Sequence, residues 1–161
     1  MFLSKIKKVV EIIKASFDDS VIPLHRPIFK GNEKDYVIDA IDSTFVSSVG
    51  QYVNKFEEYV SNYTSIKNSV ATVNGTSSLH IALKLSGVKE NDEVITQPLT
   101  FVATVNAIKY LQAIPVFIDV NSQNFGMCPI SLENFLFENA EIRSGQAYNK
   151  ISGNRIKACL P

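Results

Sequence analysis

The sequence predicts an α/β fold in which crossover helices connect the strands of a mostly parallel sheet. From residue 69 onward, short β-branched runs alternate with segments whose apolar residues recur at helical spacing. The connections between these segments are short, which is typical of parallel strands joined by right-handed crossovers. The chain has 161 residues, of which 45% are hydrophobic, and this is enough for one domain with a packed core.

The individual elements follow from apolar runs and their spacing. Strands are expected over 69–73, 92–97, 114–120 and 156–160. Helices are expected over 2–17, 33–44, 52–63, 76–86 and 100–111, and from a cap at Ser131 to Ala140. Residues 143–155 are polar and lack periodicity, so they are expected to form a loop.

The first predicted helix, over residues 2–17, is separate from this pattern. It carries an apolar stripe at Leu3, Ile6, Val10, Ile13 and Phe17, and lysines interrupt it throughout. A transmembrane helix needs about 20 apolar residues, and a signal peptide needs an unbroken apolar centre and a small-residue cleavage site. Neither is present. A docking helix and a helix lying on a membrane surface remain as alternatives.

The predicted organisation is an N-terminal helical extension over 1–20, followed by an incomplete domain over 21–161. The last predicted strand stops at Pro161, at the point where a strand should lead into its functional loop. An intact domain rarely ends there, so the sequence is expected to be truncated.

Composition excludes several classes of function. Lys+Arg and Asp+Glu balance at 16 each, so no strong field steers nucleic acid or an anionic membrane toward the whole chain. Cys128 and Cys159 are far apart and lack metal-type spacing. This favours a reducing, cytoplasmic compartment over a disulfide scaffold, and no metal site is expected.

The turn that follows the first predicted strand is a candidate phosphate site. The first N–H groups of a helix have no partner within the helix and lie at the positive end of its dipole. Gly75 lets the backbone approach a ligand, and Thr76 and Ser77 add hydroxyl groups. The turn is neither a Walker loop nor a dinucleotide-binding glycine pattern. A plain N-capped helix is the alternative interpretation.

Phe101 is a second candidate, because it follows the next predicted strand and lies at the same carboxyl edge of the sheet. Its position on the apolar face of its helix suits the core. An aromatic ring at a strand–helix junction also suits stacking on a planar cofactor ring. The residue pattern alone leaves both roles open.

Several blocks of the chain resemble the DegT/DnrJ/EryC1/StrS aminotransferases, in order and with sensible spacing. The blocks are residues 22–24 with Pro27, residues 45–50 with Phe56 and Glu57, and then residues 74–83, 92–96, 100–108 and 115–120. The resemblance covers the chain from about residue 21 to its end. Among the members of the family, those that act on UDP-linked 4-keto-6-deoxy amino sugars are the most similar.

The resemblance implies a fold-type-I, pyridoxal-phosphate-dependent aminotransferase that works as a homodimer. Its substrates would be a nucleotide-linked keto sugar and an amino donor, with glutamate expected as the donor, in cell-surface or secreted glycan biosynthesis. By position, Gly75, Thr76 and Ser77 would hold the cofactor phosphate, and Phe101 would stack on the pyridine ring. Ser47 and Ser48 would lie near the sugar.

The family's Schiff-base lysine and its pyridine-pairing aspartate both come after the end of this chain, so no catalytic residue is assigned here. Asp119 and Lys157 are expected to have other roles, and His80 is expected to pack or to contact a partner. Three alternatives remain open. They are a pyridoxal-phosphate-dependent sugar dehydratase, a non-catalytic remnant, and a generic phosphate-binding module.

Overall fold

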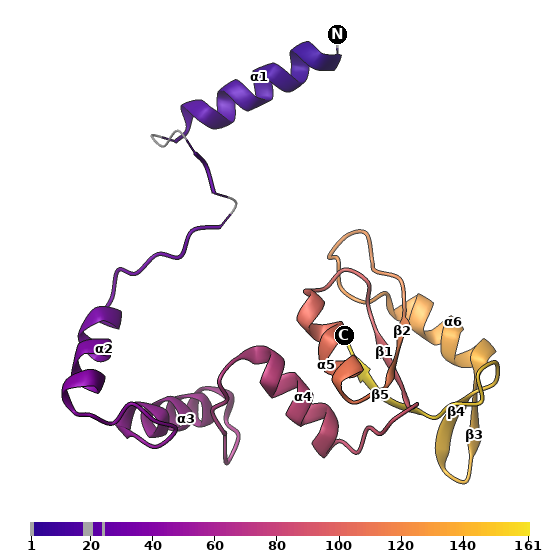
Figure 1. Ribbon diagram of the computed structural model, residues 1–161. Helices are drawn as coiled ribbons and strands as arrows, with labels where there is room; N and C mark the ends of the chain where they lie inside the picture. Colours follow the sequence, from indigo (N-terminus) through magenta and orange to yellow (C-terminus); the bar gives the residue numbers. More distant parts are fainter. Residues whose placement is uncertain (1, 18–20, 24) are drawn as a thin grey trace. The chain divides into compact units, whose positions relative to one another are not determined.

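The structure is a computed structural model that describes residues 2–17, 21–23 and 25–161. It separates into two compact units, residues 1–65 and 66–161. The described residues of the first unit form three helices, α1 (Phe2–Ala15), α2 (Glu33–Asp42) and α3 (Gln51–Thr64). They confirm the three helices predicted in this part of the sequence, with ends shifted by one or two residues (Figure 1).

Helices α2 and α3 are joined by polar contacts to one carboxylate. Oδ2 of Asp39 accepts hydrogen bonds from Gln51 Nε2 at 2.9 Å and from the Tyr52 hydroxyl at 2.8 Å. The rings of Tyr36 and Tyr52 lie 5.3 Å apart. The described residues of α2 and α3 include no buried side chain, so these contacts are made at an exposed surface.

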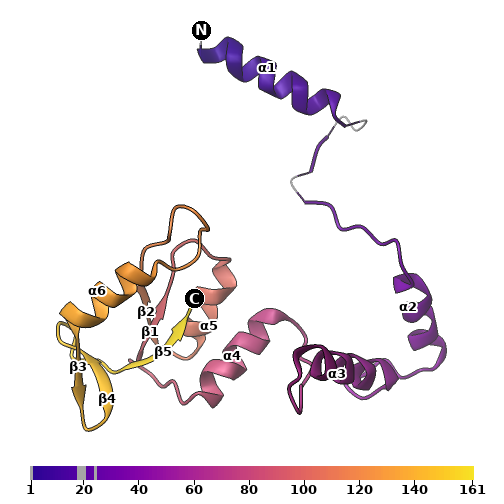
Figure 2. The ribbon, with the colours of Figure 1, turned by 180° about the vertical axis from the view of Figure 1, so that it is seen from behind.

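The second unit carries the sheet. Its elements are α4 (Gly75–Leu85), β1 (Glu93–Thr96), α5 (Val102–Tyr110), β2 (Ile114–Phe117), α6 (Pro129–Asn139), β3 (Ala140–Arg143), β4 (Gln146–Asn149) and β5 (Ile156–Leu160). Strands β2, β1 and β5 form a parallel sheet in that order. The α/β class with crossover helices is therefore confirmed. Figures 1 and 2 show α5 and α6 on opposite sides of these strands.

The core lies where α4 and α5 pack against the sheet. Val94 of the central strand and Ala107 and Ile108 of α5 are fully buried, and Leu83 of α4 is 5% exposed. Leu83 and Ile108 occupy apolar positions whose spacing predicted the two helices, and Val94 lies in the predicted strand over 92–97. Burying an aliphatic side chain of this size contributes roughly 1.5–3 kcal/mol, so this cluster fixes α4 and α5 on the strands that precede the candidate site.

The strand predicted over 69–73 is absent, and that prediction was wrong. Val70 and Val73 are 82% and 87% exposed. A strand is stabilised by hydrogen bonds to a neighbouring strand. Within residues 25–161, the sheet is limited to β2, β1 and β5, and none of these strands pairs with this segment. The β-branched composition alone therefore does not produce a strand here.

The predicted loop over 143–155 contains part of a β-hairpin instead. Strands β3 and β4 pair antiparallel, and Ser144 and Gly145 connect them with φ values of 50° and 76°. Positive φ at both positions suits the two-residue turns that match the twist of paired strands. The polar composition concealed the hairpin, because both strands are short and half-exposed.

The start of α6 also differs from the prediction of a cap at Ser131. Cys128 is the N-cap residue and Pro129 is the first helical residue. Proline suits this position because its missing N–H would have no partner in the first turn and its φ is already helical.

A buried polar cluster joins the hairpin region to the amino end of β1. Arg155 contacts both carboxylate oxygens of Asp92, from Nε to Oδ1 at 2.9 Å and from Nη2 to Oδ2 at 2.5 Å. Glu93 accepts hydrogen bonds from Asn149 at 2.9 Å and from Ser152 at 2.5 Å. Asp92 and Glu93 are 7% and 3% exposed, so two carboxylates are buried only because these partners satisfy them.

The charge of Asp92 makes the stability of this unit depend on pH. Burial raises the pKa of Asp92, but hydrogen bonds from Arg155 and from the backbone N–H of Lys89 outweigh that effect, and the net pKa is lowered. A lowered pKa in the folded state contributes stability above the unfolded value of about 3.9, and this contribution is lost as the pH falls through the folded value.

We therefore expect the difference in unfolding free energy between the wild-type chain and Asp92→Asn to be largest near neutral pH. It should shrink as the pH falls below about 4. Urea unfolding of both proteins at a series of pH values measures this difference. A difference that stays constant down to the acid limit would contradict the assigned ionisation of Asp92.

Candidate functional site

The N-terminus of α4 and the N-terminus of α5 line one hollow of about 580 Å³. Its lining residues are Asn74, Gly75, Thr76, Ser78, Leu79, Phe101, Ala103 and Thr104. The structure therefore brings the predicted phosphate turn and Phe101 together, because α4 and α5 pack against each other on the sheet. The predicted Ser77 is not among the lining residues. Asn74, Ser78, Leu79, Ala103 and Thr104 line the hollow but were not predicted as site residues. The hydroxyls at 100 and 104, one helical turn apart, were a signal for the last of these.

The backbone at the start of α4 presents donors at this hollow. Asn74 is the N-cap residue, and its Oδ1 accepts the N–H of Ser77 at 2.8 Å. The N–H groups of Gly75 and Thr76 have no acceptor in the part of the chain that the structure describes. Both belong to the first turn, where the helix dipole is positive. The N-cap interpretation and the phosphate interpretation are thus compatible, since the cap uses the third N–H and leaves the first two.

Gly75 has ordinary helical backbone angles. A Cβ built on it would meet no heavy atom within 4 Å, apart from its immediate surroundings in the helix. The packing of this unit therefore does not demand glycine at position 75.

Phe101 is 79% exposed, so it is not part of the core of this chain. It precedes α5 with extended backbone angles, as the N-cap residue of that helix. Behind it, the hydroxyls of Thr100 and Thr104 lie 2.9 Å apart. An exposed aromatic ring beside a row of backbone donors can bind a planar group that carries an anion.

Two buried polar atoms lie at the carboxyl end of β1, immediately before the turn to Phe101. Thr96 Oγ1 and Gln97 Oε1 have no hydrogen-bond partner among the described residues. Thr96 is fully buried. An unsatisfied buried polar group costs about 1–3 kcal/mol, so this end of the strand has unused hydrogen-bonding capacity close in sequence to the hollow.

Ser47 and Ser48 lie in the first unit. The Ser47 hydroxyl donates to the carbonyl of Val49 at 3.2 Å and accepts its N–H at 3.1 Å. Ser47 lines a hollow of about 250 Å³ that also includes Phe45, Gly50 and Tyr52. Ser48 is not among its lining residues. The loop over 45–50 is thus held by local hydrogen bonds, and Ser47 faces an open concavity.

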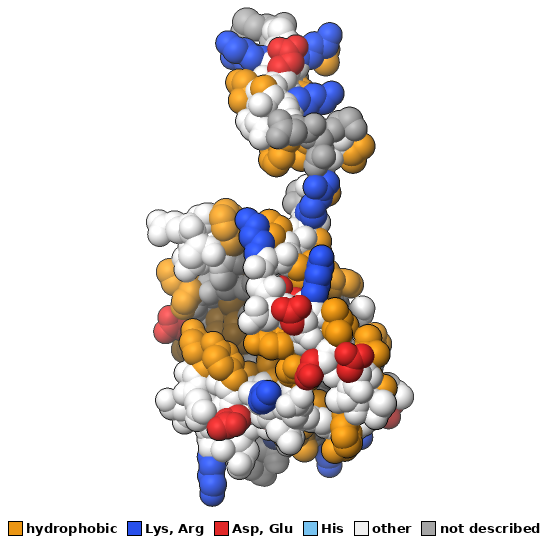
Figure 3. Space-filling view, turned by 90° about the vertical axis from the view of Figure 1, so that its left-hand side faces the viewer, with side chains coloured by type: hydrophobic (Ala, Val, Ile, Leu, Met, Phe, Trp, Pro, Cys, Tyr) orange, Lys and Arg blue, Asp and Glu red, His pale blue; other side chains and the backbone are white. Residues whose placement is uncertain are grey.

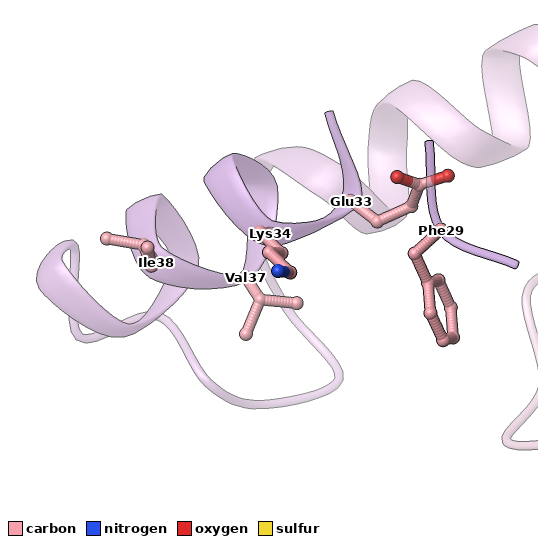
Figure 4. A pocket seen from close by; sticks show the side chains of 5 residues that line it. All are labelled: Phe29, Glu33, Lys34, Val37 and Ile38. Carbon is pink, nitrogen blue, oxygen red and sulfur yellow. The ribbon is translucent and has the colours of Figure 1, made fainter. Parts of the chain in front are cut away.

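A further hollow, of about 380 Å³, lies beside α2 and is lined by Phe29, Glu33, Lys34, Val37 and Ile38 (Figure 4). Its lining is mainly apolar, and it contains no predicted site residue.

Other predicted residues have structural surroundings. The His80 ring meets the Tyr110 ring edge-on, with centroids 5.8 Å apart, which joins α4 to α5. Lys157 lies in β5 with its side chain beside Gly87, just past the carboxyl end of α4. Because α4 is 11 residues long, about 16 Å separates its two ends. Lys157 is thus remote from the hollow at its amino end.

Among the described residues, neither a metal centre nor a membrane-crossing helix was found. Across the described ranges, no group of three or more His, Cys, Asp or Glu side chains could hold a metal ion. The helices of those same ranges are all too short or too polar to cross a membrane.

The model of the DegT/DnrJ/EryC1/StrS aminotransferase family matches residues 27–141, which is most of the chain and includes both sides of the hollow. The chain belongs to this family. GDP-perosamine synthase of Escherichia coli O157:H7 is 41% identical over 112 residues, which are 70% of this chain and 31% of that relative. The chain spans about three tenths of the length of the curated relatives it matches.

Solved structures agree with the family assignment. The aminotransferase from Psychrobacter cryohalolentis is 32% identical with a TM-score of 0.63, covering 70% of this chain and 29% of that one. A Streptococcus pneumoniae protein described as a sugar aminotransferase, solved in a PLP form, is 28% identical with a TM-score of 0.61 and the same coverage. The predicted family and fold class are therefore confirmed.

Proposed function

We propose that this chain is the part of a pyridoxal-phosphate-dependent sugar aminotransferase that holds the cofactor. The observation that carries the proposal is the hollow in which the free N–H groups of Gly75 and Thr76 and the exposed ring of Phe101 come together. A phosphate and a planar aromatic ring are the two recognisable parts of pyridoxal phosphate, and the hollow offers one partner for each.

The residues present fit this group. Gly75 and Thr76 would bind the phosphate through their backbone N–H groups. The N–H of Ser77 already donates to Asn74 and is not free for the phosphate. Ser77 would therefore contribute only its hydroxyl. Phe101 would orient the ring by stacking. When bound, pyridoxal phosphate supplies an electron-accepting ring that stabilises negative charge on the amino-donor carbon. In this chain the assigned residues bind and orient, and no residue is assigned to proton transfer.

The proposed substrates are a nucleotide-linked keto sugar and an amino donor, with glutamate as the donor. Support comes from the E. coli relative, whose name contains a nucleotide-linked amino sugar. Ser47 and Ser48 are proposed to contact the sugar, and the open hollow beside Ser47 supports that role. We further propose a cytoplasmic homodimer that serves glycan biosynthesis.

The test begins with the coding sequence beyond the codon for Pro161. The protein made from the complete reading frame would then be assayed for the absorbance of bound pyridoxal phosphate. Transfer of nitrogen from glutamate to a nucleotide-linked keto sugar would be followed by mass spectrometry. Cofactor binding with nitrogen transfer is the expected result. A product that has lost a sugar hydroxyl and gained no nitrogen would indicate a sugar dehydratase instead. A stop codon after Pro161 with no cofactor binding would leave a non-catalytic remnant.

Replacement of Gly75 by alanine tests the phosphate assignment. We expect Gly75→Ala to leave the unfolding free energy unchanged or slightly higher, because the added methyl meets open space and alanine favours the helix. The affinity for pyridoxal phosphate is expected to fall several-fold, since the methyl hinders close approach to the backbone. Urea unfolding and a cofactor titration measure the two effects. Unchanged cofactor affinity would argue against phosphate binding at this turn.

A further inference from the structure

Helix α1 has one apolar face with lysines at both of its borders. With 3.6 residues per turn, Leu3, Ile6, Val9, Val10 and Ile13 share one side of the helix. Their side chains are 43–73% exposed. Lys7 and Lys14 then fall along one border of that face, and Lys5 falls at the other, between Val9 and Ile12. Figure 3 shows lysine and hydrophobic side chains next to one another on this helix.

The charge of α1 is unlike that of the chain as a whole. The helix carries four lysines and one glutamate, a net charge of +3, whereas the complete chain is neutral. Glu11 lies farther from the apolar face than Lys5, Lys7 and Lys14, so lysines are the charged residues closest to that face. Residues 2–15 also lie outside the segment 27–141 that the family model matches. The helix is therefore an addition to the part shared with the family.

The basic borders decide which occupant suits the apolar face. In a pair of such helices from two copies, the lysines of one copy would face those of the other, and like charges at close range are unfavourable. An anionic lipid surface has the opposite property, because acyl chains receive the apolar face while lysine side chains extend to the headgroups. We propose that α1 is an interfacial helix that binds an anionic lipid surface and does not cross it.

Cosedimentation of the full chain with lipid vesicles tests this proposal. One set of vesicles contains phosphatidylcholine alone, and the other contains phosphatidylcholine with phosphatidylglycerol. We expect the chain to sediment with the second set, to sediment far less with the first, and to be released by added salt. Lys7→Gln and Lys14→Gln are each expected to lower the partition coefficient roughly fivefold. Absence of binding to the anionic vesicles would overturn the proposal.

A matched pair of substitutions separates the apolar face from net charge. Ile13→Glu and Ala15→Glu each add one negative charge, but only the first interrupts the apolar face. We expect Ile13→Glu to abolish vesicle binding and Ala15→Glu to weaken it only several-fold. Circular dichroism of both variants checks that the rest of the chain is unchanged. Equal losses in the two variants would contradict insertion of the face. If the chain self-associates and does not bind vesicles, the apolar face of α1 would instead be a contact with a second copy of the chain.

Discussion

Arg155→Ala is expected to cost about 3–5 kcal/mol of unfolding free energy, the range observed when one partner of a buried ion pair is removed. Arg155 is the cation that both carboxylate oxygens of Asp92 contact, and its side chain is 20% exposed against 9% for that of Asp92. Without the guanidinium, a buried carboxylate would keep only its hydrogen bond from the N–H of Lys89. Urea unfolding followed by circular dichroism measures the loss.

Arg143→Ala is the matched control. Arg143 forms an ion pair with Glu141 in the neighbouring hairpin, but the two side chains are 54% and 38% exposed. Pairs at such exposure contribute at most about 1 kcal/mol. Its guanidinium also lies over the Tyr148 ring at 5.4 Å, which adds a contribution of similar size. We expect Arg143→Ala to cost much less than Arg155→Ala, and similar costs would refute the burial argument.

If the proposed cofactor site is correct, Phe101→Ala is expected to lower the affinity of the protein from the complete reading frame for pyridoxal phosphate about tenfold. An aromatic stacking contact is worth roughly 0.5–1.5 kcal/mol beyond the area that it buries, and the lost apolar contact adds to this. Because Phe101 is 79% exposed, the substitution should change the unfolding free energy little. Cofactor titration of the protein from the complete reading frame, followed by absorbance, measures the affinity.

Phe137→Ala provides the comparison for Phe101. Phe137 lies on α6, is 85% exposed, and is not among the residues that line the hollow. Both substitutions remove an exposed ring, so they should affect stability alike, and only Phe101→Ala should affect cofactor affinity. Phe101→Tyr, which keeps the ring, should retain most of the affinity. Equal affinities of Phe101→Ala and Phe137→Ala for pyridoxal phosphate would show that Phe101 does not contact the cofactor.

Three of the four residues predicted for the cofactor, Gly75, Thr76 and Phe101, line one hollow, whereas Ser77 does not line it and five further lining residues were not predicted. The turn and Phe101 were expected at one edge of the sheet. A glycine and two hydroxyl residues before an apolar helix indicated phosphate binding at residues 75–77. The residue pattern alone was compatible with a core position for Phe101 and with stacking on a cofactor ring. Its 79% exposure depends on how α5 lies on the sheet, and no periodicity contains that information. The structure also showed that Asn74 uses the N–H of Ser77, leaving those of Gly75 and Thr76.

Local pattern by itself determined the helices, apart from where α6 begins, and the strands β1, β2 and β5. Apolar residues at helical spacing and short β-branched runs can be recognised without knowledge of their partners. It also determined the family, through ordered blocks along the chain. The secondary structure of the remaining segments depends on tertiary contacts. Residues 69–73 have strand composition but no partner strand, and the polar stretch after β3 pairs into a hairpin that Arg155 and Asn149 fasten to β1. Strand pairing and the burial of charge depend on residues distant in sequence, and only the folded chain brings those residues together.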